Sequence, residues 1–177
     1  MVLSGIVLAN NTRFGNVIVL QNLAHDIALS IRQAQVYGIA VRRCDPTVTE
    51  LCPAINQFDV AYGVHFMGGE PTFELFVDVD NSGDYDPGET VLSSTIATGY
   101  RIDDLCVTPA VGGAETCGLE ELNVVFRRPE PDACINGSFD SDDDCVSSYA
   151  RARIIIKSAR DDEAEVIVER TGQISAL

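Results

Sequence analysis

Apolar and polar residues alternate with a helical period over the first part of the chain. The apolar positions recur every three or four residues, at Phe14, Val17, Ile18, Leu20, Leu23, Ala24, Ile27, Ile31, Ala34 and Tyr37. This spacing places them along one stripe of a helix. No proline interrupts residues 1–45, and Gly38 follows the last apolar position, as a C-terminal cap would. The pattern predicts one helix from about Val2 to Tyr37, roughly 54 Å long at about 1.5 Å per residue.

The start of this helix, Met1–Ala9, is apolar and carries no charge. It is too short to cross a bilayer, which takes ~20 residues, and it lacks the basic region and cleavage site of a signal peptide. We interpret it as the second half of a membrane helix that continues into the folded domain. The alternative, a core helix with a frayed start, fits Thr12–Tyr37. It leaves five apolar side chains without a partner: Val2, Leu3, Ile6, Val7 and Leu8.

Beyond Gly38 the apolar residues recur at every second position, which is typical of strands. The predicted strands are Phe58–Phe66, Thr72–Val79, Glu89–Leu92, Thr95–Ile102, Leu122–Arg128, Ala152–Ser158, Glu165–Arg170 and Gln173–Ala176. Short polar turns at Arg160–Glu163 and Thr171–Gly172 predict hairpins. No helical segment separates the strands, so they should pair antiparallel. The expected fold is α+β, with a long N-terminal helix (1–38) packed on an antiparallel sheet or two-sheet β-sandwich (39–177).

Composition narrows the function. The chain has 27 acidic and 12 basic residues and a formal net charge of −15. Such a surface repels nucleic acid and anionic lipid head groups. The two histidines, His25 and His65, are far apart in sequence, and no hydrolase, nucleotide-binding or dinucleotide motif is present. We therefore expect a protein that is not an enzyme and that binds no nucleic acid.

Six cysteines fall into three successive local pairs, each bracketing a polar stretch: Cys44 and Cys52, Cys106 and Cys117, Cys134 and Cys145. Six cysteines allow 15 connectivities, and sequence does not exclude the others. Sequential pairing is the most economical, because each bridge would close one surface loop. No zinc-binding spacing is present. Structural disulfides imply an oxidising compartment, and the alternative is six reduced, buried cysteines.

The acidic segment Asp78–Glu89 matches the spacing of a twelve-residue calcium loop. A hard cation takes six to eight oxygens, and a glycine at the sixth position, Gly83, permits the sharp turn. The candidate ligands are Asp78, Asp80, Ser82, Asp84, Asp86 and Glu89, with Asp84 acting through its backbone carbonyl. The alternative is an acidic turn whose carboxylates cap local N–H groups. The loop follows a strand and has no second copy, which favours that alternative, whereas mutual repulsion of five carboxylates favours a cation.

Several features together resemble type IV pilins and type II secretion pseudopilins, in particular the GspH/FimT-like minor pilins. The resemblance rests on the half-apolar helix, the run DIALSIRQAQVYGIA at Asp26–Ala40, the loop at Phe76–Leu92 and the strand pair at Val166–Leu177. The processing motif and first half of the membrane helix of that group are missing, so we expect either a truncated chain or a start assigned too late. Some FimT-like proteins bind DNA through a basic stretch after a C-terminal glycine. Here Gly172 is followed by Gln173, Ile174 and Ser175, without arginine.

The resemblance implies a structural subunit of a type IV pilus-like or type II secretion filament. Its helix would sit in the inner membrane before assembly and then pack against other subunits, and its sheet domain would lie on the cell surface or in the periplasm. A second hypothesis is a secreted calcium-dependent adhesion or recognition module, in which the loops bind a ligand. Calcium is the one cofactor that either hypothesis invokes.

Overall fold

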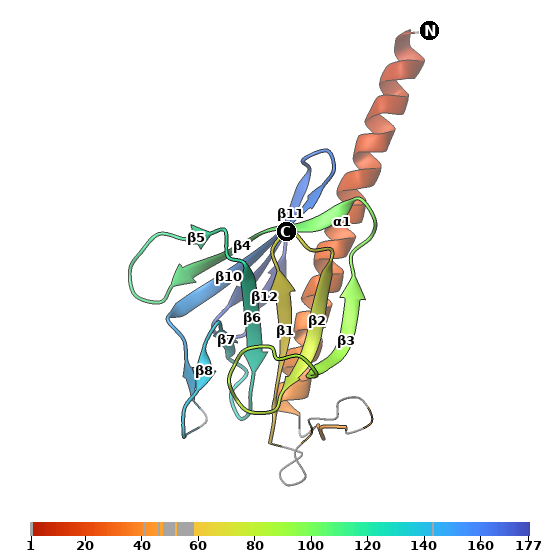
Figure 1. Ribbon diagram of the computed structural model, residues 1–177. Coiled ribbons are helices and arrows are strands. Elements are labelled where there is room, and N and C mark those ends of the chain that lie inside the picture. The colour runs from red at the N-terminus through yellow and green to blue at the C-terminus, as the bar shows by residue number, and fades with distance from the viewer. Residues whose placement is uncertain (1, 41, 46, 48–51, 53–58, 143) are drawn as a thin grey trace.

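The computed structural model describes residues 2–40, 42–45, 47, 52, 59–142 and 144–177. Within the helix, side chains are described from residue 17 onward. One helix, α1 (Val2–Ile39), precedes all the strands. Five strands form sheet A in the order β3 (Thr90–Thr95), β2 (Thr72–Asp78), β1 (Ala61–Met67), β6 (Glu121–Phe126), β7 (Ala133–Ile135). Five more form sheet B in the order β12 (Ile174–Ala176), β11 (Glu163–Glu169), β10 (Tyr149–Ser158), β4 (Tyr100–Pro109), β5 (Thr116–Cys117). A small hairpin joins β8 (Ser138–Phe139) to β9 (Cys145–Val146) (Figure 1).

Every strand pair in the two sheets is antiparallel, as the lack of helical crossovers predicts. The two predicted hairpin turns are present, one between β10 and β11 and one between β11 and β12. Asp161 and Gly172 adopt the left-handed backbone conformation that these turns require, with φ of 64° and 79°. The polar turn residues therefore fix the register of the C-terminal strands.

The two sheets and part of α1 share one hydrophobic core. Sheet A contributes Phe66, Leu75 and Phe126, and sheet B contributes Leu105 and Ile154, all essentially inaccessible to solvent. The helix adds a stripe at spacings of three and four: Leu20, Ala24, Ile27, Ala28, Ile31 and Ala34. The helix contacts strands of both sheets, including β1 and β6 of sheet A and β11 and β12 of sheet B. It thus closes one side of a β-sandwich.

The predicted α+β fold, with a long N-terminal helix packed on the sheet, is wrong. The protein is mainly antiparallel β, and the helix packs over a short stretch: among the helix side chains that the structure describes, the buried ones run from Leu20 to Ala34. Helical periodicity shows which face is apolar but does not show how much of that face meets the domain. Val17 and Ile18 belong to the predicted stripe, yet their side chains are exposed.

The five apolar residues predicted to form a filament core, Val2, Leu3, Ile6, Val7 and Leu8, lie outside the part of the helix whose side chains are described. Within the described residues, no helix is both long enough and apolar enough to cross a membrane.

Gly38 was predicted as a helix cap but has a different role. The helix continues through it to Ile39, and Gly38 lies against β6. A Cβ atom at this position would lie 2.2 Å from the carbonyl oxygen of Phe126. Gly38 is therefore needed because helix and sheet backbones approach closely there.

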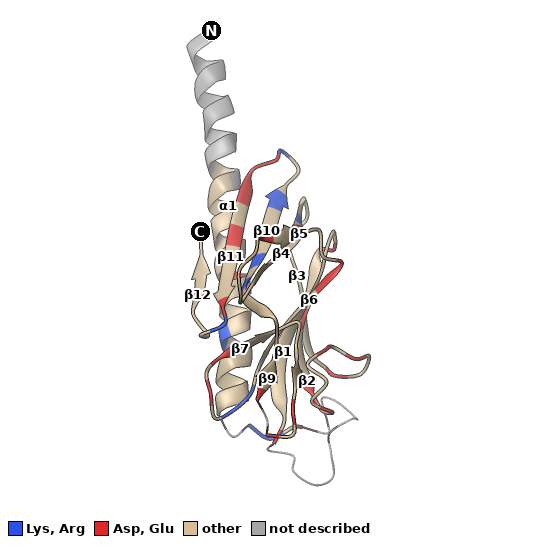
Figure 2. Ribbon diagram, turned by 90° about the vertical axis from the view of Figure 1, so that its left-hand side faces the viewer, with Lys and Arg blue, Asp and Glu red and all other residues tan. Residues whose placement is uncertain are grey.

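Basic residues lie along β10 and acidic residues along the neighbouring β11 of sheet B (Figure 2). Arg153 pairs with Glu165 at 3.0 Å, and Lys157 pairs with Asp103 at 3.1 Å and with Glu163 at 2.9 Å. These cross-strand pairs explain how β4 carries aspartates in its middle and still forms a ten-residue strand.

Three disulfides join the sequential pairs Cys44–Cys52, Cys106–Cys117 and Cys134–Cys145. Each closes a local loop, with sequence separations of 8, 11 and 11. Disulfides persist in oxidising compartments, so the protein belongs outside the cytosol.

Candidate metal centre

The acidic loop between β2 and β3 folds back over the outer face of sheet A. Apolar residues on that face form a small second cluster of Ala61, Phe76, Val125 and Cys134. Tyr85, at the middle of the loop, covers this cluster with its ring centroid 5.5 Å from that of Phe76 and 4.7 Å from that of His65. The packing of one aromatic side chain therefore positions the loop.

Three carboxylates of the loop converge. One oxygen from each of Asp78, Asp80 and Glu89 lies within 4.8 Å of the others. Asp78 is fully buried and Glu89 is 2% exposed, whereas Asp80 is exposed. Carboxylates are almost never buried without a compensating partner, so this cluster is the most unusual electrostatic feature of the described residues.

Backbone N–H groups provide part of the compensation. Asp78 accepts hydrogen bonds from the amides of Ser82 at 3.1 Å and Gly83 at 2.9 Å. Glu89 accepts them from the amides of Val79 at 2.9 Å and Asp86 at 3.0 Å. These bonds are what an acidic turn without a metal would make, and they also fix the carboxylates in the orientation in which they converge.

The hydrogen bonds do not fully offset burial. Desolvation, together with the charges of Glu89 and Asp80, raises the pKa of Asp78 to about 7. Desolvation also raises the pKa of Glu89, with smaller contributions from Asp80 and Asp86. Ionisation of these two carboxylates therefore costs free energy in the folded protein, and a bound cation would offset that cost.

Of the other predicted ligands, Ser82 borders the cluster through a side-chain hydrogen bond with Asp80, whereas the carboxylates of Asp84 and Asp86 do not belong to it. The Ser82 hydroxyl lies 3.3 Å from the Asp84 carbonyl oxygen, and the Asp86 side chain is exposed. The Asp84 carboxylate turns away and accepts a hydrogen bond from Asn123 Nδ2 at 3.1 Å. That orientation suits the predicted role of Asp84, which would use only its backbone carbonyl. The donor set of Asp78, Asp80 and Glu89 fits a hard cation such as calcium, which prefers carboxylate oxygens.

Two residues help to hold the loop in place, and the sequence did not reveal this role for either of them. His65 and Asn123 are buried on neighbouring strands β1 and β6, with His65 Nδ1 2.7 Å from Asn123 Oδ1. Asn123 in turn binds Asp84, so the sheet is linked to the loop by polar side chains as well as by Tyr85. The sequence signal that could have identified them is a polar residue within the apolar part of each of these two strands.

The loop also rests on the turn that precedes β8. Gly83 has a φ of 80°, and a Cβ atom there would lie 1.7 Å from the carbonyl oxygen of Gly137. Asn136 Oδ1 accepts a hydrogen bond from the amide of Asn123 at 2.6 Å. The Cys134–Cys145 loop therefore forms a wall of the candidate site.

A second convergent group, Asp104, Cys106 and Cys117, lacks free thiolates because the two sulfurs form a disulfide. Metal binding by cysteine requires the thiolate, so this group is not a metal site in the oxidised protein.

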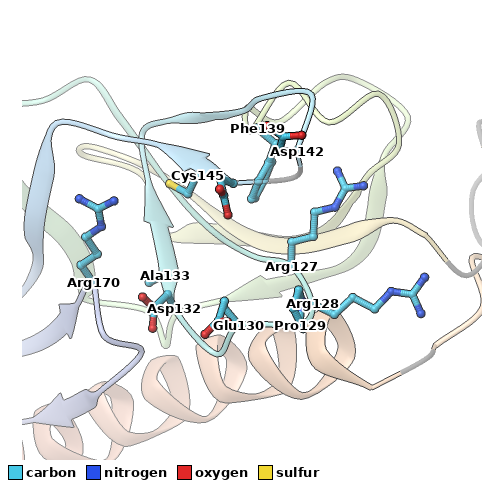
Figure 3. Close-up of a pocket in the computed structure, with 11 residues that line it drawn as sticks. Arg127, Arg128, Pro129, Glu130, Asp132, Ala133, Phe139, Asp142, Cys145 and Arg170 are labelled. Atoms are coloured by element: carbon cyan, nitrogen blue, oxygen red, sulfur yellow. The ribbon is translucent and has the colours of Figure 1, made fainter.

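A groove of about 370 Å³ lies beside the β8–β9 hairpin (Figure 3). Arg127 and Arg128 stand at one end and Arg170 at the other, with Asp132 and Asp142 among the carboxylates along its walls. Arg127 is buried, and its Nη2 lies 3.6 Å from Asp59 Oδ1. Both positive and negative groups line the groove, so its lining does not define one class of ligand.

Comparison of the chain with family models, curated proteins and solved structures gives no significant match. The functional argument therefore rests on the site and on the surfaces of the molecule.

Proposed function

We propose that this protein is a structural subunit of a type IV pilus-like or type II secretion filament and that it assembles through α1. The observation that carries this proposal is the exposure of three consecutive apolar residues, Val17, Ile18 and Val19, at 40%, 44% and 37%. They directly precede Leu20, the first buried residue among the helix positions whose burial is described.

Consecutive residues on a helix point about 100° apart, so these three side chains cover most of its circumference. A helix that is apolar all round belongs in an apolar environment. Its own domain does not supply one at this position. Neighbouring helices in a filament, or a bilayer before assembly, would supply it. The sequence carries a second apolar run from Val2 to Leu8, which a mainly polar stretch including Asn10, Asn11 and Arg13 separates from Val17.

The rest of the molecule is suited to that role. Its sheets and three disulfides make a domain that is stable outside the cytosol. In this proposal calcium binds Asp78, Asp80 and Glu89, offsets their charge and stiffens the loop on the outer face of sheet A. The metal contributes charge neutralisation, and the chain's own residues His65, Asn123 and Tyr85 position the loop.

The test is incorporation of the full-length protein into filaments in its own host. An Ile18→Asp variant should be absent from the sheared filament fraction, because a carboxylate cannot be buried among apolar helices without a large cost. Its sheet domain should unfold at the same temperature as wild type. Val111→Asp is the matched control, since Val111 is an apolar residue 91% exposed on the β4–β5 loop, and it should assemble normally. Normal incorporation of the Ile18 variant would refute the proposal.

A second candidate is a secreted calcium-dependent recognition module, which the buried carboxylates of Asp78 and Glu89 favour. The two functions differ in what residues 1–9 do. Deletion of these residues should abolish filament incorporation in the first case, and it should leave calcium-dependent ligand binding intact in the second.

A further inference from the structure

The Cys106–Cys117 disulfide joins two strands at the edge of sheet B. The two cysteines are direct partners in the β4–β5 ladder, and Val107 and Thr116 form the only other pair. Their Cα atoms are 4.0 Å apart. Strand β5 lies at the outer edge of the sheet, beyond β4 (Figure 1). A two-residue ladder contributes little on its own, so the disulfide is the main link that holds β5 in place.

This disulfide is the most accessible of the three. Cys117 is exposed, whereas each of the other five cysteines is buried or half-buried. The Cys134–Cys145 bridge provides an internal comparison, because it has the same sequence separation of 11 and its sulfurs lie in the apolar cluster on the outer face of sheet A. Loop closure has the same entropic effect in the two bridges, so a difference in reactivity between them reports on their surroundings.

Charges of both signs lie beside the two sulfurs. A carboxylate oxygen of Asp104 lies within 4.8 Å of both sulfurs, Glu115 Oε2 lies 3.9 Å from Cys117 Sγ, and Arg153 contacts both sulfurs. Arg153 Nη2 is 3.9 Å from Cys106 Sγ and 4.0 Å from Cys117 Sγ. The guanidinium is held there by ion pairs with Glu115 and with Glu165, the latter at 3.0 Å. A nearby cation favours the thiolate form of cysteine and therefore makes it a better leaving group in thiol–disulfide exchange.

We propose that Cys106–Cys117 is an exchange-active disulfide whose substrate is a dithiol reductant, and that Arg153 promotes the exchange. This inference is independent of the proposed assembly function. A thiolate of the dithiol attacks the exposed Cys117 Sγ and forms a mixed disulfide. The Cys106–Cys117 bond breaks, and its electron pair leaves on Cys106 Sγ as a thiolate beside Arg153. The second thiol of the reductant then displaces Cys117, so the dithiol is oxidised to a disulfide and both cysteines are reduced and protonated.

Reduction changes the edge of sheet B. Residues beyond the ladder keep other contacts, because the amide of Gly118 donates to Asp104 Oδ1 at 2.7 Å and that of Leu119 donates to the Leu105 carbonyl at 3.2 Å. The segment from Val111 to Cys117 then lacks its covalent link to β4, and it moves away from β4 when the Glu115–Arg153 ion pair also opens. The N–H and C=O groups of Val107, which face β5 as the carbonyl of Leu105 does, become an open edge that an extended strand of another chain can pair with.

The first test treats the oxidised, full-length protein with increasing dithiothreitol, traps free thiols with iodoacetamide and maps them by mass spectrometry. Cys106 and Cys117 should be labelled first, at reductant concentrations that leave Cys134–Cys145 intact. Labelling of Cys134 and Cys145 first, or of all six cysteines together, would overturn the proposal.

The second test separates the role of Arg153 from simple exposure. An Arg153→Gln variant should be reduced at least about threefold more slowly at Cys106–Cys117, whereas Arg153→Lys, which keeps the charge, should remain close to wild type. Reduction of Cys134–Cys145 serves as the internal reference for both variants. Equal rates in the Gln variant and wild type would exclude the contribution of Arg153. Hydrogen exchange should also rise at the amide of Val107 in a Cys106→Ser/Cys117→Ser double variant, and unchanged protection there would refute the opening of the edge.

Discussion

Replacement of Asp78 by asparagine tests the electrostatics of the acidic loop directly. In the folded protein the pKa of this buried carboxyl rises from 3.8 to about 7. The folded state therefore holds a proton that the unfolded state has released between about pH 4 and pH 7. Under this linkage, stability without a cation falls as pH rises through that window.

The size of the effect follows from the shift. About three pKa units correspond to a loss on the order of 4 kcal/mol once Asp78 is fully ionised, of which roughly 2.5 kcal/mol falls between about pH 5 and pH 8. The Asp78→Asn variant cannot ionise, so its stability should depend less on pH by about that amount. The variant also loses one of the two amide hydrogen bonds to residue 78. This loss is a separate, pH-independent contribution that destabilises the variant by about 1–3 kcal/mol relative to wild type with Asp78 protonated.

The assay is urea unfolding of the full chain with chelator at about pH 5 and pH 8, repeated with excess calcium. Calcium should restore the stability of the wild type at the higher pH, by about 2.7 kcal/mol at a hundredfold excess over its dissociation constant, and should have little effect on the variant. Asp132→Asn, which removes an exposed carboxylate elsewhere, should behave like wild type. If wild type and Asp78→Asn show the same pH dependence in chelator, the burial argument is wrong.

Two other substitutions test the packing. Gly83→Ala should destabilise the protein by about 2–4 kcal/mol in urea unfolding, because the new Cβ atom would clash with the Gly137 carbonyl oxygen. Gly99→Ala is the control: Gly99 has a φ of 92° and open space around it, so its replacement should cost only about 1 kcal/mol. Equal losses in the two variants would contradict the close contact at Gly83. Phe126→Ala should cost about 3–5 kcal/mol because its ring is fully buried between the sheets and α1, and a loss below 1 kcal/mol would show that the core is not packed as described.

The strands that sequence reasoning found are those whose inward residues are uniformly apolar. Val64 and Phe66 in β1, and Ile154 and Ile156 in β10, alternate with more polar neighbours, and both strands were predicted. The second half of β4 was missed because Asp103 and Asp104 interrupt its pattern. Asp103 is satisfied by Lys157 on the neighbouring strand, and a partner that is distant in sequence is invisible to local periodicity.

The short strands β5, β7, β8 and β9 were also missed, because two or three residues carry no detectable period. The disulfides that hold β5 and β9 were nevertheless paired correctly from their order along the chain. For the acidic loop, spacing identified the candidate ligands but could not show that Asp84 turns toward Asn123. That orientation depends on β6, which lies more than thirty residues further along the chain.

The packing of α1 against both sheets bears on how the molecule responds to mechanical load. A force applied along the helix is transmitted to both sheets at once, because the helix contacts β1 and β6 on one side and β11 and β12 on the other. Arg32 adds a direct link, donating from Nη2 to the Ile174 carbonyl at 3.0 Å. The local disulfides prevent the loops that they close from extending under load. A stretched molecule would therefore lengthen by sliding of the helix along the two sheets or by separation of strands.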